Sequence, residues 1–167
     1  MEGGLIALGR RYLTLIYTLY REQIIPAPIE DVWAYFATPR NLNEMTPPDM
    51  AFEFLRGGEK PMYPGQMILY KVMILPGVRV RWQTQITHVD PGIRFIDEQR
   101  AGPYRLWIHE HYFEPLASGV RMTDRVTYAL PFGPLGDLVQ AVYIRRRLTH
   151  IFDYRRDKVN MLFSGSS

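Results

Sequence analysis

Hydrophobic and polar residues alternate along much of the chain, and this is the pattern of β-strands that bury one face. Between Val78 and Val89, one face carries Val80, Trp82, Thr84 and Ile86, and the other carries Arg79, Arg81, Gln83 and Gln85. Near the C-terminal end, one face carries Val120, Met122, Asp124, Val126 and Tyr128. One apolar and one solvated face are typical of an antiparallel sheet that is covered on one side only.

Seven runs of this kind predict seven strands. Their bounds are residues 12–25, 51–56, 66–75, 78–89, 93–100, 104–114 and 120–130. The last six runs are separated by short segments rich in glycine and proline, such as PG, DPG and PLASG. Parallel neighbours need crossover connections of a dozen or more residues, so we expect an antiparallel meander.

Two short helices should follow the first strand. Pro28 suits a first helical position, two acidic residues follow it, and an apolar stripe runs along the segment. Pro39 ends this helix near Thr38, and Thr38 can cap a second helix that starts at Pro39 and ends before Pro47.

The segment from Gly136 to Phe163 has no internal proline or glycine, and its apolar residues recur at helical spacing. This predicts one long amphipathic helix, which is the obvious cover for the apolar face of the sheet. The expected fold class is α+β: a seven-stranded antiparallel sheet wrapped around a long C-terminal helix, with two short helices after the first strand.

Composition narrows the possible functions. The 167 residues include no cysteine, 47% are hydrophobic, and the net charge is only +3. A disulfide, a cysteine nucleophile and a thiolate zinc site are therefore excluded, and the charge gives no argument for nucleic acid. We expect a cytoplasmic protein without stable membrane insertion, formed by one domain over residues 12–163. Residues 1–11 should be a loosely attached extension, and residues 164–167 a flexible tail.

Four stretches carry a resemblance to a known family: IYTLYREQIIPAPIEDVWAYFATPRNLNEMTPP, GPYRLWIHEHYF, MTDRVTYALPFGPLG and IFDYRRDKV. They closely resemble a bacterial, single-domain subgroup of the START-like or SRPBCC superfamily that is often labelled cell-division-inhibitor-like. The resemblance covers about Ile16 to Val159. It implies a helix-grip fold with a cavity between sheet and helix. Relatives include lipid carriers, hormone receptors and polyketide cyclases, so the fold implies a site and not a reaction.

The run WIHEHYF is the most informative stretch. Partly by resemblance, we place its tryptophan, both histidines and Phe113 on the inner face, because the glutamate between the histidines is the poorer candidate for burial. If Phe113 pairs with Val120 in the next strand, His109 lies opposite Asp124. A shift of two residues puts His111 opposite Asp124 instead, and either register makes a histidine and a carboxylate neighbours.

Three interpretations of this histidine and carboxylate pair compete. The first is a divalent metal site formed by the two histidines and a carboxylate. HEHYFE followed by PFG superficially resembles the metal-binding cupin signature, but only two residues separate His111 from Glu114 and no histidine follows PFG. The second interpretation is acid and base catalysis of the cyclase, dehydratase or isomerase type, with His109, His111 and Asp124 as catalytic residues. The third, which we favour, is a pocket in which these groups orient the polar end of a ligand. We therefore expect no metal and no cofactor.

The favoured function is the binding of a hydrophobic small molecule, such as a lipid, a quinone or a polyketide-like compound, by a carrier or sensor. The residues expected to contact it are Phe36, Trp82, Trp107, His109, His111, Asp124, Tyr128, Phe132, Val139, Val142 and Tyr143. Phe132 should flank the entrance.

Arginines form two groups in the sequence. Those of the C-terminal helix, which are Arg145, Arg146, Arg147, Arg155 and Arg156, should be solvated, with some pairing to helix ends or carboxylates. Those of the outer sheet face, which are Arg79, Arg81, Arg121 and Arg125, belong to an interspersed charged surface or attract an anionic partner. The remaining alternative function is thus a protein-interaction module, whose partner the sequence does not identify.

Overall fold

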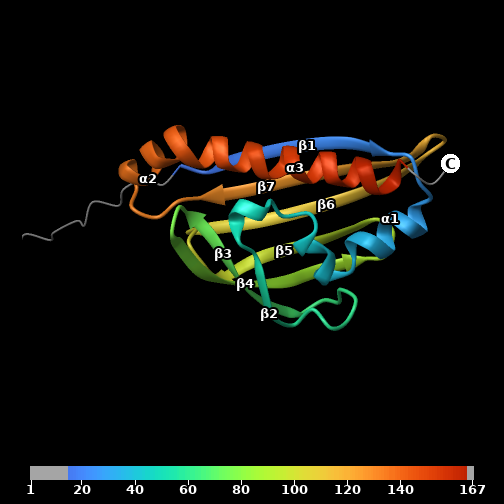
Figure 1. Ribbon diagram of the computed structural model, residues 1–167, viewed down its shortest axis with the longest axis horizontal. Coiled ribbons are helices and arrows are strands. Elements are labelled where there is room, and N and C mark those ends of the chain that lie inside the picture. The colour runs from blue at the N-terminus through green and yellow to red at the C-terminus, as the bar shows by residue number, and fades with distance from the viewer. Residues whose placement is uncertain (1–14, 165–167) are drawn as a thin grey trace, which may run out of the picture.

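Seven antiparallel strands form one sheet that curves around a long helix (Figure 1). The computed structural model describes residues 15–164. The strands are β1 (Tyr17–Ile25), β2 (Glu53–Arg56), β3 (Met67–Leu75), β4 (Val78–Asp90), β5 (Arg94–Ala101), β6 (Leu106–Leu116) and β7 (Gly119–Ala129). Their order in the sheet is β1-β7-β6-β5-β4-β3-β2, so the six strands after β1 form the expected meander and β1 closes on β7.

The termini lie partly outside the described residues. The expected extension, residues 1–11, and the beginning of the first expected strand, residues 12–14, are among the residues not described, as are residues 165–167 of the expected tail. Within the described part, β1 starts at Tyr17.

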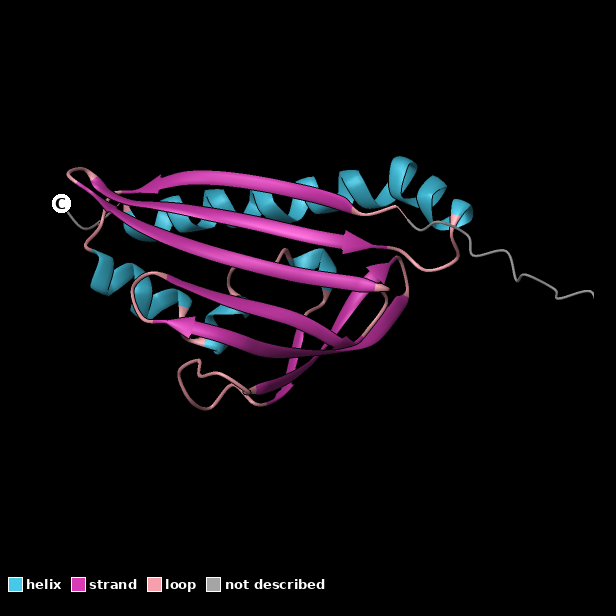
Figure 2. Ribbon diagram, turned by 180° about the vertical axis from the view of Figure 1, so that it is seen from behind, coloured by secondary structure: helices cyan, strands magenta, loops and turns pink. Residues whose placement is uncertain are grey.

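The two faces of the sheet are those that the alternation predicts. Along β7, all of the residues predicted to point inward are buried, including Asp124. The outer face lies on the side without helices among the described residues (Figure 2). Its arginines have acidic neighbours: Arg79 pairs with Glu53, and Arg121 pairs with Glu114. This favours the interspersed charged surface over an anionic-partner site.

Two short helical segments follow β1 as expected, and a third lies just beyond them. α1 (Ile29–Phe36) begins directly after Pro28, and its buried side chains come from the predicted apolar stripe. A 3₁₀ helix at Pro39–Asn43 is followed by a second 3₁₀ turn at Pro48–Met50. Thr38 does not cap through its side chain, because its hydroxyl donates to the Ala34 carbonyl at 2.8 Å instead.

The C-terminal helix runs from Pro134 to Phe163, but it is not regular throughout. α2 (Pro134–Val139) leads into a π-helical turn at Gln140–Ile144, and α3 (Arg145–Phe163) follows. Such a turn inserts an extra residue and shifts the buried stripe around the helix axis. Gln140 in this turn is buried, and its amide donates to the Tyr128 hydroxyl at 3.2 Å.

Two clusters of the buried core lie on either side of Asp124. The cluster near α1 contains Ile25, Val32, Phe36, Met45, Phe95, Phe113, Val120, Met122 and Val159. The cluster beneath the first half of α3 contains Val126, Tyr128, Leu148 and Phe152. Met122 and Val126 flank Asp124 along β7, so a buried carboxylate interrupts an otherwise apolar row.

Candidate functional site

Two buried histidines on β6 lie in the middle of the inner sheet face. His109 and His111 are both buried, and their rings lie against one another with centroids 3.7 Å apart. Phe95 stacks on His111 at 4.0 Å, and Phe152 of α3 meets His109 edge-on at 5.5 Å. The predicted inward orientation of the histidines is therefore observed, and aromatic rings fix both imidazoles between sheet and helix.

Asp124 of β7 contacts both histidines. The register places His111 opposite Asp124, which is the second of the two registers expected from the sequence. The Asp124 Oδ1 atom accepts a hydrogen bond from His109 Nε2 at 2.8 Å and lies 3.0 Å from His111 Nδ1. The second contact lacks hydrogen-bond geometry, and we describe it as an ion pair. One carboxylate oxygen thus serves two imidazoles.

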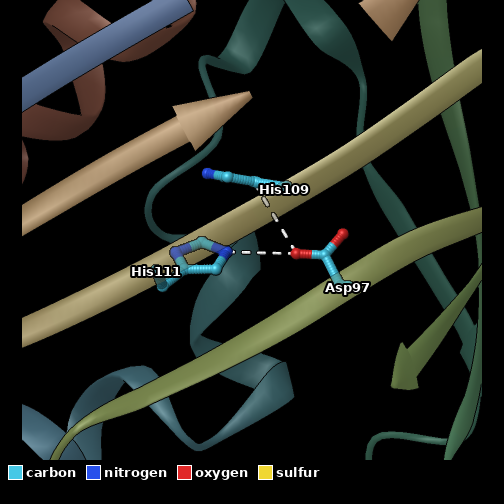
Figure 3. Close-up of side chains that lie close together, drawn as sticks. All are labelled: Asp97, His109 and His111. Carbon is cyan, nitrogen blue, oxygen red and sulfur yellow. Dashed lines mark hydrogen bonds and ion pairs between the residues drawn. The ribbon is translucent and has the colours of Figure 1, made fainter. Parts of the chain in front are cut away.

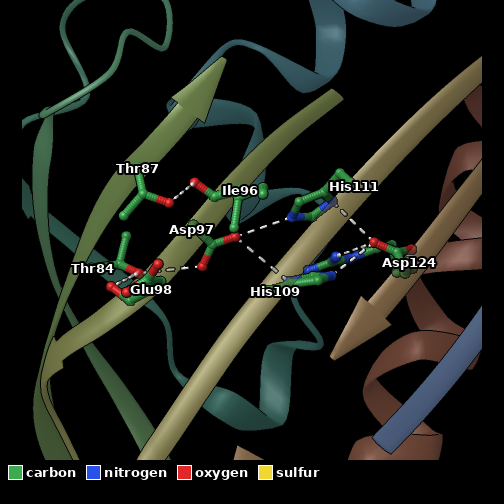
Figure 4. A network of polar contacts seen from close by, with 9 residues as sticks. Thr84, Thr87, Ile96, Asp97, Glu98, His109, His111 and Asp124 are labelled. Carbon is green, nitrogen blue, oxygen red and sulfur yellow. Dashed lines mark hydrogen bonds and ion pairs between the residues drawn. The ribbon is translucent and has the colours of Figure 1, made fainter. Parts of the chain in front are cut away.

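Asp97 of β5 is a second carboxylate beside the histidines, and the sequence analysis missed it (Figure 4). It lies opposite His109 in the register, and its Oδ2 is 3.0 Å from His111 Nε2 and 3.7 Å from His109 Nδ1. Its other oxygen, Oδ1, accepts a hydrogen bond from Thr84 on β4 at 3.2 Å. Four neighbouring strands, β4 to β7, therefore position these side chains.

Arg155 of α3 joins the network from the helix side. The expected solvation is wrong, because its side chain is buried, but carboxylate pairing is observed: its Nη1 lies 3.7 Å from Asp124 Oδ1, and its guanidinium lies over the Phe152 ring at 5.0 Å. The carboxylate and the aromatic ring compensate for the loss of water around the cation. We call Asp97, His109, His111, Asp124 and Arg155 the polar cluster.

The pKa values of the two histidines in the polar cluster shift in opposite directions. Burial, and then the neighbouring His111, lower the pKa of His109. Burial also opposes protonation of His111, but its contacts with Asp124 and Asp97 outweigh burial and raise its pKa. Burial is likewise outweighed at Asp97 and Asp124, whose pKa values the histidines lower. The two carboxylates thus favour the charged form of His111, whereas burial and His111 favour the neutral form of His109.

A cavity of about 380 Å³ lies between the sheet and the helices, with the polar cluster on its wall. This volume is within the range of about 300 to 1,000 Å³ that small-molecule sites occupy. Most of the lining is apolar, from the 3₁₀ segments, β3, β4 and the C-terminal helix. Asp97 keeps 17% of its side chain exposed because it faces this space. The cavity offers an apolar interior with a few convergent polar groups.

The cavity brings together most of the residues that the sequence predicts as ligand contacts. The predicted residues that line it are Phe36, Trp82, Trp107, His109, His111, Phe132 and Val139. Phe132, Leu135 and Val139 line it and are 80%, 63% and 42% exposed, so we call these three residues the rim. Phe132 thus lies where an entrance residue is expected.

Four predicted contacts do not line the cavity. Asp124 lies behind the histidines, and the buried Tyr128 hydroxyl is taken by Gln140. Tyr143 donates to the Ile74 carbonyl at 3.1 Å, and Val142 is 62% exposed. The latter two were assigned to the wall on the assumption of a regular helix, and the π-helical turn that contains them changes that geometry.

Asp97 and Arg155 had weak signals in the sequence. Phe95 and Asp97 share one face of their strand, so burial of Phe95 implies that Asp97 points inward. Ile96 on the other face obscured this alternation. Arg155 lies three residues after Phe152 and four before Val159, on the buried stripe of α3.

Three groups of the polar cluster have metal-ligating chemistry and face the cavity. Asp97, His109 and His111 each offer one ligand atom, and these atoms lie within 4.8 Å of one another (Figure 3). The arrangement is thus competent for orienting a ligand, for proton transfer or for holding a cation.

The chain belongs to the family described as polyketide cyclase / dehydrase and lipid transport, whose model matches residues 25–150. This agrees with the resemblance noted in the sequence, since the helix-grip fold is observed as well. A search among curated proteins found no match. In residues 15–164, no helix has both the length and the hydropathy to cross a bilayer.

Solved structures share the fold. A Chromobacterium violaceum protein is 16% identical with a TM-score of 0.67, over 88% of this chain and 97% of its own. A Staphylococcus aureus protein of unknown function is 12% identical with a TM-score of 0.68, over 92% of this chain and 96% of its own. A Mycobacterium smegmatis protein is 19% identical with a TM-score of 0.65, over 90% of this chain and 92% of its own. At these identities the likeness concerns the fold alone.

Proposed function

We propose that the protein is a carrier or sensor that binds a hydrophobic small molecule, such as a lipid, a quinone or a polyketide-like compound, in the cavity between sheet and helix. The observation that carries the proposal is a largely apolar cavity of ligand size with one polar cluster on its wall. The family description, which includes lipid transport, supports the same class of ligand.

The polar cluster gives the ligand an orientation. An apolar molecule gains from burial along most of the wall, by about 25 cal/mol for each Å² of apolar surface removed from water. A carbonyl, hydroxyl or carboxylate at one end would meet the cluster members on the wall, which are Asp97, His109, His111 and Arg155. A position against the apolar part of the wall would leave that polar group without a partner, which costs about 1 to 3 kcal/mol.

Two valines of the C-terminal helix provide a matched test. Val139 lies on the rim, whereas Val142 is exposed and does not line the cavity. Val139→Trp should narrow the opening and weaken binding of a fluorescent fatty-acid probe by about tenfold or more, because its indole competes for cavity space. Val142→Trp adds the same bulk outside the cavity and should bind as the wild type does.

The binding experiment should be joined to native mass spectrometry of gently purified protein and to solvent extraction of any bound compound. We expect a co-purifying apolar ligand in the wild type and in Val142→Trp, and less of it in Val139→Trp. If probes of all three ligand classes fail to bind, or bind equally to both variants, the cavity is not the binding site.

A second candidate function is acid and base catalysis of the cyclase, dehydratase or isomerase type. It is favoured by the 2.8 Å hydrogen bond between His109 and Asp124, because a carboxylate-oriented histidine on a cavity wall can move a proton. His109→Ala and Asp124→Ala should then each abolish turnover of a bound substrate in protein that circular dichroism shows to be folded. Unchanged turnover in both variants would exclude this function.

A further inference from the structure

The ring nitrogens of the two cluster histidines are sorted into two sides. On one side, His109 Nε2 and His111 Nδ1 lie 2.8 and 3.0 Å from Asp124 Oδ1. On the other side, His109 Nδ1 and His111 Nε2 lie 3.7 and 3.0 Å from Asp97 Oδ2. Both imidazoles therefore direct one nitrogen toward Asp124 and the remaining nitrogen toward Asp97, as Figure 4 shows.

The Asp124 side has the form of a supporting shell. Histidines that bind metals usually donate their other ring N–H to a carboxylate, which fixes the tautomer and the ring orientation. Asp124 accepts such a hydrogen bond from His109 and lies 3.0 Å from His111 Nδ1 without hydrogen-bond geometry, and it does not itself line the cavity. Arg155 lies 3.7 Å from the same oxygen and balances its charge.

The Asp97 side has the form of an open ligand set. Asp97, His109 and His111 all line the cavity, and Thr84 holds Asp97 Oδ1 so that Oδ2 faces the two rings (Figure 4). In a tetrahedral site with bonds of about 2.1 Å, ligand atoms lie about 3.4 Å apart. The observed separations from Asp97 Oδ2, 3.0 and 3.7 Å, lie on either side of that value.

We propose that Asp97 Oδ2, His109 Nδ1 and His111 Nε2 form a binding site for a divalent first-row transition metal ion such as Zn²⁺ or Fe²⁺. Two imidazoles and one carboxylate suit these ions, whereas Mg²⁺ and Ca²⁺ prefer sites made only of oxygen ligands. The proposal reverses the expectation from the sequence, which had compared the histidines only with the cupin spacing and lacked Asp97.

The site has room for a further ligand on its cavity side. Three protein ligands leave at least one coordination position of such an ion free. Because the three ligands line the cavity, that position is available to an oxygen anion on a bound molecule, such as a carboxylate, a phenolate or an enolate. This inference adds a metal to the cavity and does not require any one class of apolar ligand.

Cobalt binding to untagged, chelator-treated protein tests the site, since Co²⁺ has visible absorption that reports its ligands. We expect one equivalent per chain and a rise in the melting temperature, because an ion that binds only the folded state stabilises it. Asp97→Asn and His111→Gln should each weaken binding about 100-fold or more. Asp124→Asn, which alters only the supporting shell, should weaken it about 10- to 100-fold.

The chain offers matched histidine controls. His88 on β4 is exposed and apart from the cavity, so His88→Gln should bind Co²⁺ as the wild type does. His150 lies 3.4 Å from Asp49 on the surface and could hold an ion adventitiously. Loss of binding in His150→Gln with retention in Asp97→Asn would place the ion there and overturn the proposal.

Circular dichroism and the melting temperature under chelation establish whether each variant folds. If either Asp97→Asn or His111→Gln does not fold, the other variant still tests the site. Absence of Co²⁺ and Zn²⁺ binding by the folded wild type, or equal binding by Asp97→Asn and His111→Gln, would overturn the site. The Val139→Trp and Val142→Trp comparison uses an apolar probe under chelation, so failure of the metal site and failure of the cavity are distinguishable.

Discussion

The polar cluster and the rim are both parts of the cavity wall, yet they are built in opposite ways. The cluster residues lie on paired strands and on α3, with their side chains almost entirely buried and in contact with one another. The rim residues lie on the loop after β7 and on α2, and Phe132 and Leu135 are 80% and 63% exposed. The first arrangement holds polar groups in place, and the second leaves apolar side chains free to adapt.

This difference separates two contributions to ligand binding. Hydrogen bonds require fixed geometry, and a sheet supplies it through cross-strand register. Contact with an apolar chain has no such directional requirement, so a short helix and a loop suffice. We therefore expect changes in the cluster to affect stability strongly and changes at the rim to affect binding with little effect on stability.

Asp124→Ala should have the largest effect on stability. It removes the anion shared by His109, His111 and Arg155, and breaking a buried charge network by removing one partner costs about 3 to 5 kcal/mol. Urea unfolding under chelation measures this loss in the free energy of unfolding. Asp90→Ala is the matched control, since Asp90 pairs with Arg94 at the surface, where such a pair contributes about 0 to 1 kcal/mol. Equal losses of stability in Asp124→Ala and Asp90→Ala would contradict the distinction between the buried cluster and a surface ion pair.

Arg155→Met should have the next largest effect. Methionine preserves much of the packing against Phe152 but leaves Asp124 without its nearby cation, and we expect a loss of about 2 kcal/mol. Arg156→Met, one position further on the exposed side of α3, should change the free energy of unfolding by less than about 0.5 kcal/mol. A stable Arg155→Met protein would show that the buried arginine is not structurally required.

Acid should reduce the advantage of the wild type over Asp124→Asn. The pKa of Asp124 is lowered in the folded protein, so its stabilisation is present above the unfolded pKa of about 3.9 and is lost as pH falls. The stability gap should narrow between pH 5 and pH 3 under chelation, a range below the ordinary histidine pKa of about 6.5 in which the carboxyl group titrates in the unfolded chain, by urea unfolding at each pH. A stability difference between the wild type and Asp124→Asn that widens over this pH range would contradict the prediction.

Phe132→Asn at the rim should have the smallest effect on stability, and in the opposite direction. Phe132 has a φ of 71°, which asparagine tolerates better, and its exposed ring contributes little packing. We expect a gain of about 0.5 kcal/mol together with weaker binding of the apolar probe. Phe132→Ala loses the ring without relieving the backbone and should weaken binding alone, and a destabilised Phe132→Asn would contradict this explanation.

The same contrast explains what the sequence could reveal. Strand alternation depends on near neighbours, and it predicted the sheet and its inner face, whereas the inward placement of the histidines rested partly on the family resemblance. The cluster depends on contacts between distant strands. Alternation does not say that Asp97 lies opposite His109, and it left two registers open for Asp124. Arg155 was misassigned because charged helix residues are mostly exposed, and only the network around Asp124 explains its burial.

The most direct test of the central claim is a nitrogen-15 NMR spectrum of the histidine side chains during titration with a long-chain fatty acid, under chelation. The chain has only four histidines, so each imidazole can be followed. If the ligand's polar end meets the cluster, the signals of His109 and His111 will shift in proportion to binding, while those of His88 and His150 remain unchanged. Saturable binding that leaves His109 and His111 unperturbed would contradict the account.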